Sequence, residues 1–204
     1  MIEILYEDKN IVFCVKPVGM SSEVDLPIEL AKQLQSEIYT LHRLDTPVGG
    51  VMVYAKNKNT AAKFSRKIAE NSDFEKTYLA VCQGTFDETY GEMEDLLFKD
   101  SRKNKSFVVK KERKGVKKAN LTYKVLATAK YNECDCSLVE VTLKTGRSHQ
   151  IRVQFASRKH PLLGDGKYGS NINCPISLFS YKIETEGKSF CKNPPCQKPW
   201  NLFN

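Results

Sequence analysis

The sequence predicts an α+β fold with a largely antiparallel sheet, folded as a single domain. Apolar stretches of strand length recur along the 204 residues, whereas only a few segments show helical spacing. Runs of strands with few helices are typical of the α+β class. A content of 41% hydrophobic and 27% charged residues is enough to build a core, and no internal repeat or low-complexity linker divides the chain.

Strands are expected wherever short apolar or alternating runs end at turn residues. Residues 2–15 run into IVFCV and end at the turn Lys16-Pro17-Val18-Gly19, which predicts a strand or hairpin. In SLVEVTL, Val139, Val141 and Leu143 share one face, as the period of a strand requires. The strand candidates after the first hairpin are 51–55, 77–82, 120–127, 137–143 and 178–183.

Three segments are expected to be helices. Asp25 followed by Pro27 is typical of a helix start, and the spacing of the following apolar residues places Ile28, Ala31 and Leu34 on one face. A second helix is predicted from Thr60 to Asn71, and a third over 148–158. The face predicted for the second helix consists of Ala61, Phe64, Ser65 and Ile68.

Composition argues against several classes of protein. No apolar run approaches the ~20 residues of a membrane helix, and MIEILYEDKN does not resemble a secretory signal, so we expect no membrane association and a cytoplasmic location. The spacings of the seven cysteines do not match a zinc site, which favours reduced thiols. Cys14 and Cys82 lie in apolar runs and are expected to be buried.

The net charge of +8 is concentrated in one segment. Residues 101–118, SRKNKSFVVKKERKGVKK, contain nine Lys or Arg and one Glu, so this segment alone accounts for the whole excess. A charge run is often only a solvated face. Here Phe107, Val108 and Val109 interrupt it and predict a strand, so we expect a basic hairpin that binds a polyanion backbone.

The first polar segment of interest is His42-Arg43-Leu44-Asp45, directly before the apolar strand VMVYA. Burying an ionised carboxylate is costly unless it is paired and hydrogen-bonded. Asp45 therefore either faces water in a turn or is held in its charged form for chemistry. Taken alone, such a tetrapeptide is also typical of a polar turn, and a single histidine is more often structural than catalytic.

The second polar segment is 145–152, TGRSHQIR, which follows the strand ending at Leu143. It combines two arginines, a histidine and a glutamine near a predicted helix start, which is typical of an anion site. A polar turn at a strand end explains the same pattern. His149 and His160 are likewise compatible with structural roles, and Tyr78 with a half-buried strand position.

Other readings of these motifs fail on spacing. HRLD is not the catalytic loop of a protein kinase, because the chain lacks the glycine-rich loop and the DFG motif. GDGKYG at 164–169 lacks the spacing of a phosphate-binding P-loop. Asp45 and Asp165 are isolated acids among basic residues, whereas a metal-dependent nuclease needs clustered carboxylates.

Three segments in order resemble the pseudouridine synthases of the RluA type (ribosomal large subunit pseudouridine synthase A-like). They are HRLDTPVGGVMVYAKN, KTYLAV and LKTGRSHQIRVQFASRKHPLLGDGKYG, and ILYEDKNIVFCVKPVGM resembles the opening strand and KPxG turn of that family. The resemblance implies one catalytic α+β domain over 1–204, with a long bent mixed, largely antiparallel sheet and a central RNA-binding cleft. It implies that a uridine in RNA is detached at N1, turned and rejoined through C5, with no cofactor or metal.

The resemblance also implies roles for particular residues. Asp45 is the expected catalytic aspartate, Tyr78 the active-site tyrosine and Arg152 the arginine that pairs with the aspartate. Attack on the sugar, attack on the base and removal of a sugar proton are all compatible with Asp45. The expected substrate-binding residues are His42, Arg43, Arg147, His149 and Gln150, and the residues expected to bind the RNA backbone are Lys110, Lys111, Arg113 and Lys114.

The chain departs from the family pattern in places. Because the matching segments begin near Met1, we expect no S4-type RNA-binding domain, and a basic insertion over about 99–118 instead. Gln154 stands where many relatives have His, and Gly49 where many have Ser. The expected partner is ribosomal or transfer RNA, and the expected state is a monomer. A catalytically silent RNA-binding or RNA-chaperone protein on the same fold is the alternative.

Overall fold

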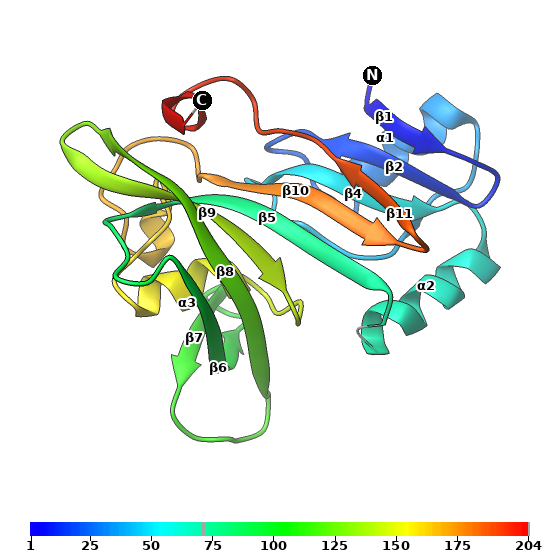
Figure 1. Ribbon diagram of the computed structural model, residues 1–204. Coiled ribbons are helices and arrows are strands. Elements are labelled where there is room, and N and C mark those ends of the chain that lie inside the picture. Colours follow the sequence, from blue (N-terminus) through cyan, green and yellow to red (C-terminus); the bar gives the residue numbers. More distant parts are fainter. Residues whose placement is uncertain (71, 204) are drawn as a thin grey trace. The chain divides into compact units, whose positions relative to one another are not determined.

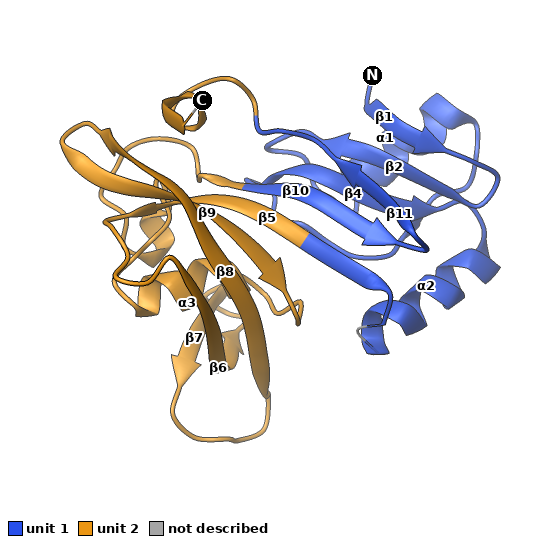
Figure 2. Ribbon diagram, viewed as in Figure 1, with its two compact units in different colours: residues 1–76, 179–194 blue, residues 77–178, 195–204 orange. Residues whose placement is uncertain are grey.

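The structure is a computed structural model that describes residues 1–70 and 72–203 (Figure 1). It divides into two compact units (Figure 2): unit 1 comprises residues 1–76 and 179–194, and unit 2 comprises 77–178 and 195–204. Strand β5 (Phe74–Gln83) begins in unit 1 and ends in unit 2. The predicted α+β class with a mixed, largely antiparallel sheet is confirmed, and one catalytic domain over 1–204 stays a prediction.

Unit 1 is built on a mixed arrangement of strands. Its order is β1-β2-β4-β10, with β3 paired to β4 and β11 to β10. The pairing of β4 with β10 is parallel, whereas the pairings β1–β2, β2–β4, β3–β4 and β10–β11 are antiparallel. The strands are β1 (Glu3–Glu7), β2 (Ile11–Lys16), β3 (Tyr39–Thr40), β4 (Gly49–Ala55), β10 (Leu178–Thr185) and β11 (Lys188–Cys191).

The core of unit 1 explains why β4 reads as an unbroken apolar run. Every residue of β4 is buried, because the strand lies between β2 and β10. Phe13 of β2 stacks on Phe190 of β11 with ring centroids 4.0 Å apart. The buried cluster around them consists of Ile11, Phe13, Val51, Val53, Phe64, Phe74 and Ile183.

The two helices of unit 1 form at their predicted positions, but the first of them buries a different face from the predicted one. Helix α1 (Asp25–Leu34) begins at Asp25 as expected, but it buries Leu26 and Leu30 and leaves Ile28 49% exposed. The predicted face was therefore wrong, because the apolar stripe starts two residues earlier, at Leu26. Helix α2 (Lys58–Glu70) buries Phe64, and the predicted end at Asn71 lies outside the described residues.

Unit 2 contains antiparallel strand pairs and one strand that the sequence did not predict. Its strand order is β5-β9-β8-β6-β7, with β6 (Tyr90–Asp100), β7 (Lys105–Val109), β8 (Val116–Tyr131) and β9 (Cys134–Leu143). The strand predicted over 120–127 extends to 116–131, because the alternation that buries Ala119 and Leu121 continues beyond the predicted apolar run, with Lys118 and Asn120 on the other face. Strand β6 was not predicted from apolar runs, because its sequence GEMEDLLFKD contains acidic and polar residues.

Helix α3 (Gln150–Ser157) lies within the predicted 148–158 and packs against β6 and β7 (Figure 1). Its residues 150–155 are all buried, so this short helix is a core element rather than a surface helix. Two 3₁₀ turns follow, η1 (Gly166–Tyr168) and η2 (Trp200–Phe203). Among the described residues no helix is long and apolar enough to span a membrane.

Two cysteines match the sequence expectation, since Cys14 and Cys82 are fully buried. Burial raises the pKa of Cys14 to about 12 and places that of Cys82 well above its ordinary value. In residues 1–70 and 72–203 no three His, Cys, Asp or Glu side chains cluster as metal ligands would.

Gly50 tests the parallel contact between β4 and β10. Its φ of +121° disfavours any side chain, and a Cβ there would lie 2.3 Å from the carbonyl oxygen of Ser180 on β10. We expect Gly50→Ala to lower the free energy of unfolding by about 2–5 kcal/mol, since it adds left-handed strain to overpacking against backbone. Urea-induced unfolding of the purified variant measures this loss.

Gly187→Ala is the matched control. Gly187 also has a positive φ, +69°, in the β10–β11 turn, but a Cβ there would meet nothing within 4 Å. Its expected cost is therefore the backbone strain alone, about 1–2 kcal/mol. Equal costs for the two variants would show that the close approach at Ser180 is not a constraint.

Candidate active site

The loop that carries Asp45 joins β3 to β4 and is held by hydrogen bonds from unit 1. Ser22 binds Leu44 twice, because its hydroxyl donates to the Leu44 carbonyl (2.9 Å) and accepts from the Leu44 N–H (3.1 Å). The Tyr54 hydroxyl of β4 in turn donates to the Ser22 carbonyl (2.7 Å). The residue next to Asp45 is therefore fixed, although Asp45 itself is only half-buried.

Lys16, at the end of β2, holds the other side of this loop from inside the protein. It is 1% exposed, and its Nζ donates to the carbonyls of Pro17 (2.9 Å), Met20 (2.7 Å) and Thr46 (3.2 Å). Burial lowers the pKa of Lys16 to about 8, while the charges of Asp45 and Asp25 act against that shift. The ammonium stays protonated at neutral pH and places a fixed positive charge in the surroundings of Asp45.

His42 is a neutral brace of the same loop. Its Nε2 accepts a hydrogen bond from the Val53 N–H of β4 (3.3 Å), and its ring packs edge-on against Phe74. Burial and the nearby charge of Lys76 lower the pKa of His42 to about 3. Within the described chain, His42 Nδ1 has no hydrogen-bond partner. This environment favours the structural role considered for His42, whereas Arg43 next to it is exposed.

The second polar segment forms a loop fastened to β8. The Oε1 of Gln150 accepts from the Thr145 hydroxyl (2.8 Å) and the Arg147 N–H (3.0 Å), and its Nε2 donates to the Asn120 carbonyl (3.1 Å). Arg147 is exposed, and its Nε donates to the Lys118 carbonyl (2.8 Å). Gln150 is buried and bound to protein atoms, which indicates loop positioning rather than the substrate contact expected for it.

Arg152 lies on α3 with its guanidinium buried in unit 2. Its Nε donates to Asp165 Oδ2 (2.7 Å) and its Nη2 to Asp165 Oδ1 (2.9 Å), a bidentate pair with side chains 5% and 0% exposed. The guanidinium also lies over the Tyr168 ring, 5.2 Å from its centroid. The partner of Asp165 is thus a basic residue that lies thirteen positions earlier, on a helix.

Tyr78 and Gln154 are buried at other positions of unit 2. Tyr78 lies in β5 and is 5% exposed. Gln154 on α3 is fully buried, and its Nε2 donates to Asp95 Oδ2 (2.7 Å) and to the carbonyls of Met93 and Ala119 (both 3.3 Å). Gln154, which stands where many relatives have His, therefore helps to pack α3 against β6 and β8. Of the three expected catalytic residues, Asp45 belongs to unit 1, and Tyr78 and Arg152 belong to unit 2.

The basic segment 101–118 forms a hairpin and the turn that follows it, as expected. Residues 101–104 connect β6 to β7, and residues 110–115 connect β7 to β8. The Arg113 guanidinium lies 4.6 Å from the centroid of Phe98, and Phe107 and Val108 are each 36% exposed. All four residues expected to bind the RNA backbone lie exposed in the β7–β8 turn: Lys110, Lys111, Arg113 and Lys114.

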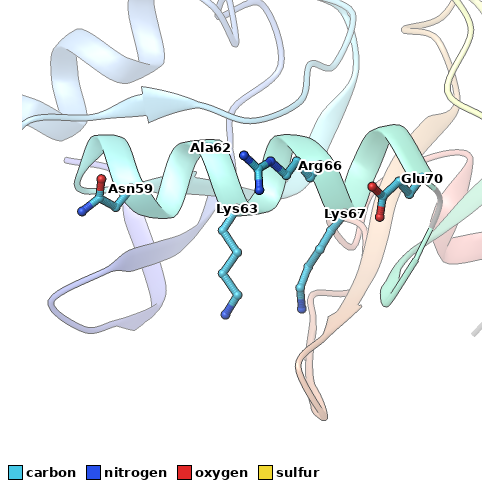
Figure 3. A pocket seen from close by; sticks show the side chains of 6 residues that line it. All are labelled: Asn59, Ala62, Lys63, Arg66, Lys67 and Glu70. Atoms are coloured by element: carbon cyan, nitrogen blue, oxygen red, sulfur yellow. The ribbon is translucent and has the colours of Figure 1, made fainter.

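A shallow depression of about 550 Å³ lies along α2 (Figure 3) and contains none of the expected site residues. Figure 3 shows Lys63 and Lys67 extending from the same side of the helix. Their charges are paired, Lys63 with Glu186 and Lys67 with Asp73 and Glu186. This pairing makes α2 a weaker polyanion surface than the β7–β8 turn. Its lining residues are Asn59, Ala62, Lys63, Arg66, Lys67 and Glu70.

Three residues of the site escaped the sequence interpretation. Lys16 follows the apolar strand IVFCV and precedes a proline, which marks it only as a turn residue. Asp165 and Tyr168 lie in the glycine-rich GDGKYG. This segment received no predicted role, because its spacing does not match a P-loop. For Lys16 and Asp165 a signal was present, since a charged residue at the edge of a buried run needs a partner.

The fold is shared with solved structures. The human protein named RNA Pseudouridylate Synthase Domain Containing 1 superposes with a TM-score of 0.83 over 97% of this chain and 85% of that chain, at 22% identity. The human RNA Pseudouridylate Synthase Domain Containing 4 superposes with a TM-score of 0.79 over 95% and 88%, at 23% identity. At these identities the likeness establishes the fold.

Sequence comparison establishes the family. The chain is 32% identical to ribosomal large subunit pseudouridine synthase D of Borreliella burgdorferi, over 94% of this chain and 63% of that protein's length. It is 31% identical to tRNA pseudouridine synthase C of Vibrio cholerae, over 85% of this chain and 76% of that protein. A sequence model described as RNA pseudouridylate synthase matches residues 10–157. The chain therefore belongs to the RNA pseudouridylate synthase family, in agreement with the resemblance of its motifs to the RluA type.

Proposed function

We propose that this protein isomerises uridine in RNA to pseudouridine, with Asp45 as the catalytic carboxylate. The observation that carries the proposal is the rigidly held Asp45 loop in a chain of this family. Lys16 and Ser22 fix the residues on both sides of Asp45, and a buried ammonium supplies charge beside it. A protein that only bound RNA would gain nothing from holding a carboxylate in this way.

The chemistry needs no group from outside the chain. The N1–C1′ bond of the nucleotide breaks, the base turns, and a C5–C1′ bond forms, while C5 loses its hydrogen as a proton and N1 takes up a proton. Asp45 is the group proposed to act on the sugar or the base, and Tyr78 offers an aromatic face for the base and a hydroxyl for proton transfer. Arg152 is proposed to pair with Asp45, because a planar guanidinium suits a carboxylate better than an ammonium does.

The proposed substrate is ribosomal or transfer RNA, the two classes named for the relatives. The target base has to leave its stack, which costs a few kcal/mol and is cheapest in loops and single strands. The exposed Arg43 and Arg147, together with His149, are proposed to bind phosphate or the extruded nucleotide. The protein is proposed to act as a cytoplasmic monomer.

Release of tritium from RNA labelled at uridine C5 tests the reaction directly. Wild-type protein is expected to release tritium, and Asp45→Asn to lower the rate by at least about 10²-fold, since a reacting group is lost while size and shape are kept. RNA affinity, measured by filter binding, should change little. Asp87→Asn, an exposed loop aspartate in the other unit, is the control and should behave as wild type.

The alternative function gives the opposite result in this assay. A binding-only RNA chaperone releases no tritium from ribosomal or transfer RNA and retains its RNA-annealing activity in the Asp45→Asn variant. Absence of tritium release by the wild-type protein would remove the synthase proposal.

The basic segment is expected to supply affinity without base specificity. Changing Lys110, Lys111, Arg113 and Lys114 to Gln should weaken RNA binding and reduce the slope of log K against log salt by up to about 3–4, since each lost phosphate contact removes ~0.7–0.9. The control changes four exposed lysines elsewhere, Lys9, Lys58, Lys130 and Lys159, and lowers the net charge equally. Equal slopes for the two variants would mean that net charge alone matters.

A further inference from the structure

The turn Gly164–Gly169 of unit 2, GDGKYG, joins the predicted catalytic arginine to the basic hairpin. It follows α3 and contains the 3₁₀ turn η1. Asp165 in this turn is fully buried and Tyr168 is 9% exposed. The two side chains point to different partners, Asp165 to Arg152 on α3 and Tyr168 to Ser106 on β7.

The contact with Arg152 fixes the direction of its guanidinium. A bidentate pair defines the plane of the guanidinium as well as its distance from the carboxylate, which a single hydrogen bond does not. Asp165 Oδ1 and Oδ2 each accept one N–H of Arg152, at 2.9 and 2.7 Å. Both side chains are buried, so water does not compete for these hydrogen bonds.

The backbone of the turn is itself held rigidly. The Asp165 carbonyl accepts from the N–H groups of Tyr168 (3.0 Å) and Ser170 (3.1 Å), and its own N–H donates to the Leu162 carbonyl (3.1 Å). At Gly164, with a φ of +76°, a Cβ would lie 2.3 Å from the Cys174 carbonyl oxygen. The carboxylate that orients Arg152 is therefore mounted on a backbone with little freedom to move.

The Tyr168 hydroxyl fastens the basic hairpin to the same turn. It accepts from the Ser106 N–H of β7 (2.8 Å) and is hydrogen-bonded to His149 Nδ1 (2.8 Å). A second link runs from the Ser106 hydroxyl to the Ser148 carbonyl (2.6 Å). The Tyr168 ring therefore lies close to both α3 and β7, since its centroid is 5.2 Å from the Arg152 guanidinium and 5.1 Å from Lys105 Nζ.

We propose that this turn positions the catalytic and RNA-binding parts of unit 2 through two separable contacts. Asp165 is a positioning residue for Arg152 and serves turnover, whereas the Tyr168 hydroxyl and Ser106 hold the hairpin of β6 and β7 and serve RNA affinity. The proposal rests on the proposed function, because it takes Arg152 as catalytic and RNA as the substrate. It goes beyond that function by assigning roles to three residues outside the expected site.

Steady-state tritium release separates the two contacts. Asp165→Asn keeps the shape of the side chain but weakens the hold on Arg152, and we expect kcat to fall by at least tenfold with KM within twofold of wild type. Tyr168→Phe keeps the ring over Arg152 and removes the hydroxyl, and we expect KM and the Kd for RNA to rise about fivefold or more. Ser106→Ala should shift KM in the same direction without any change in the turn.

The control is Asp135→Asn. Asp135 is exposed on β9, so this variant removes a carboxylate charge from unit 2 without touching the turn, α3 or the hairpin of β6 and β7. Both constants should stay within twofold of wild type. Urea unfolding of every variant verifies that the compared proteins are folded.

The proposal would be overturned if Asp165→Asn and Tyr168→Phe both lowered kcat and raised KM by similar factors. It would also be overturned if Asp165→Asn kept the kcat of the wild-type protein. If Asp165→Asn does not fold, Tyr168→Phe and Ser106→Ala still decide, because a fall in kcat at unchanged KM in those two contradicts the assignment. Failure of the proposed function is distinguishable, since the wild-type protein would then release no tritium at all.

Discussion

The buried ion pair between Arg152 and Asp165 is the constraint on which unit 2 depends. Removing two charges from water costs several kcal/mol for each, and this cost is offset only when geometry and hydrogen bonding are nearly ideal. The bidentate contact and the aromatic ring of Tyr168 supply those conditions. Because loss of one partner leaves an uncompensated buried charge, the spacing of α3 and the following turn is tied to this contact.

Unit 1 uses a second buried charge in a different way. The Lys16 ammonium is surrounded by three carbonyl oxygens, one of them from Thr46 beside Asp45. Carbonyl dipoles stabilise the ammonium and at the same time fix the loop that provides them. Lys16 therefore positions the backbone of a loop, whereas Arg152 is paired with the side chain of Asp165.

The parts that the sequence predicted well are those set by local pattern. The strands at 51–55 and 137–143 and the position of α2 follow from periodicity, which reports burial directly. The motif HRLD and its companions carried the family and the expected catalytic residues. Periodicity failed for Ile28 and for β6, because a helix chooses its buried face by its neighbours and a strand with one wet face tolerates acidic residues.

The sequence by itself determined the α+β class, the family and the concentration of positive charge in residues 101–118. All three depend on residue types and spacing along the chain. Tertiary structure alone decided the partner of Arg152, the buried state of Lys16 and the neutral, bracing role of His42. The physical reason is that burial and pairing are properties of contacts between distant segments, and the charge on a residue does not reveal whether water or another side chain will balance it.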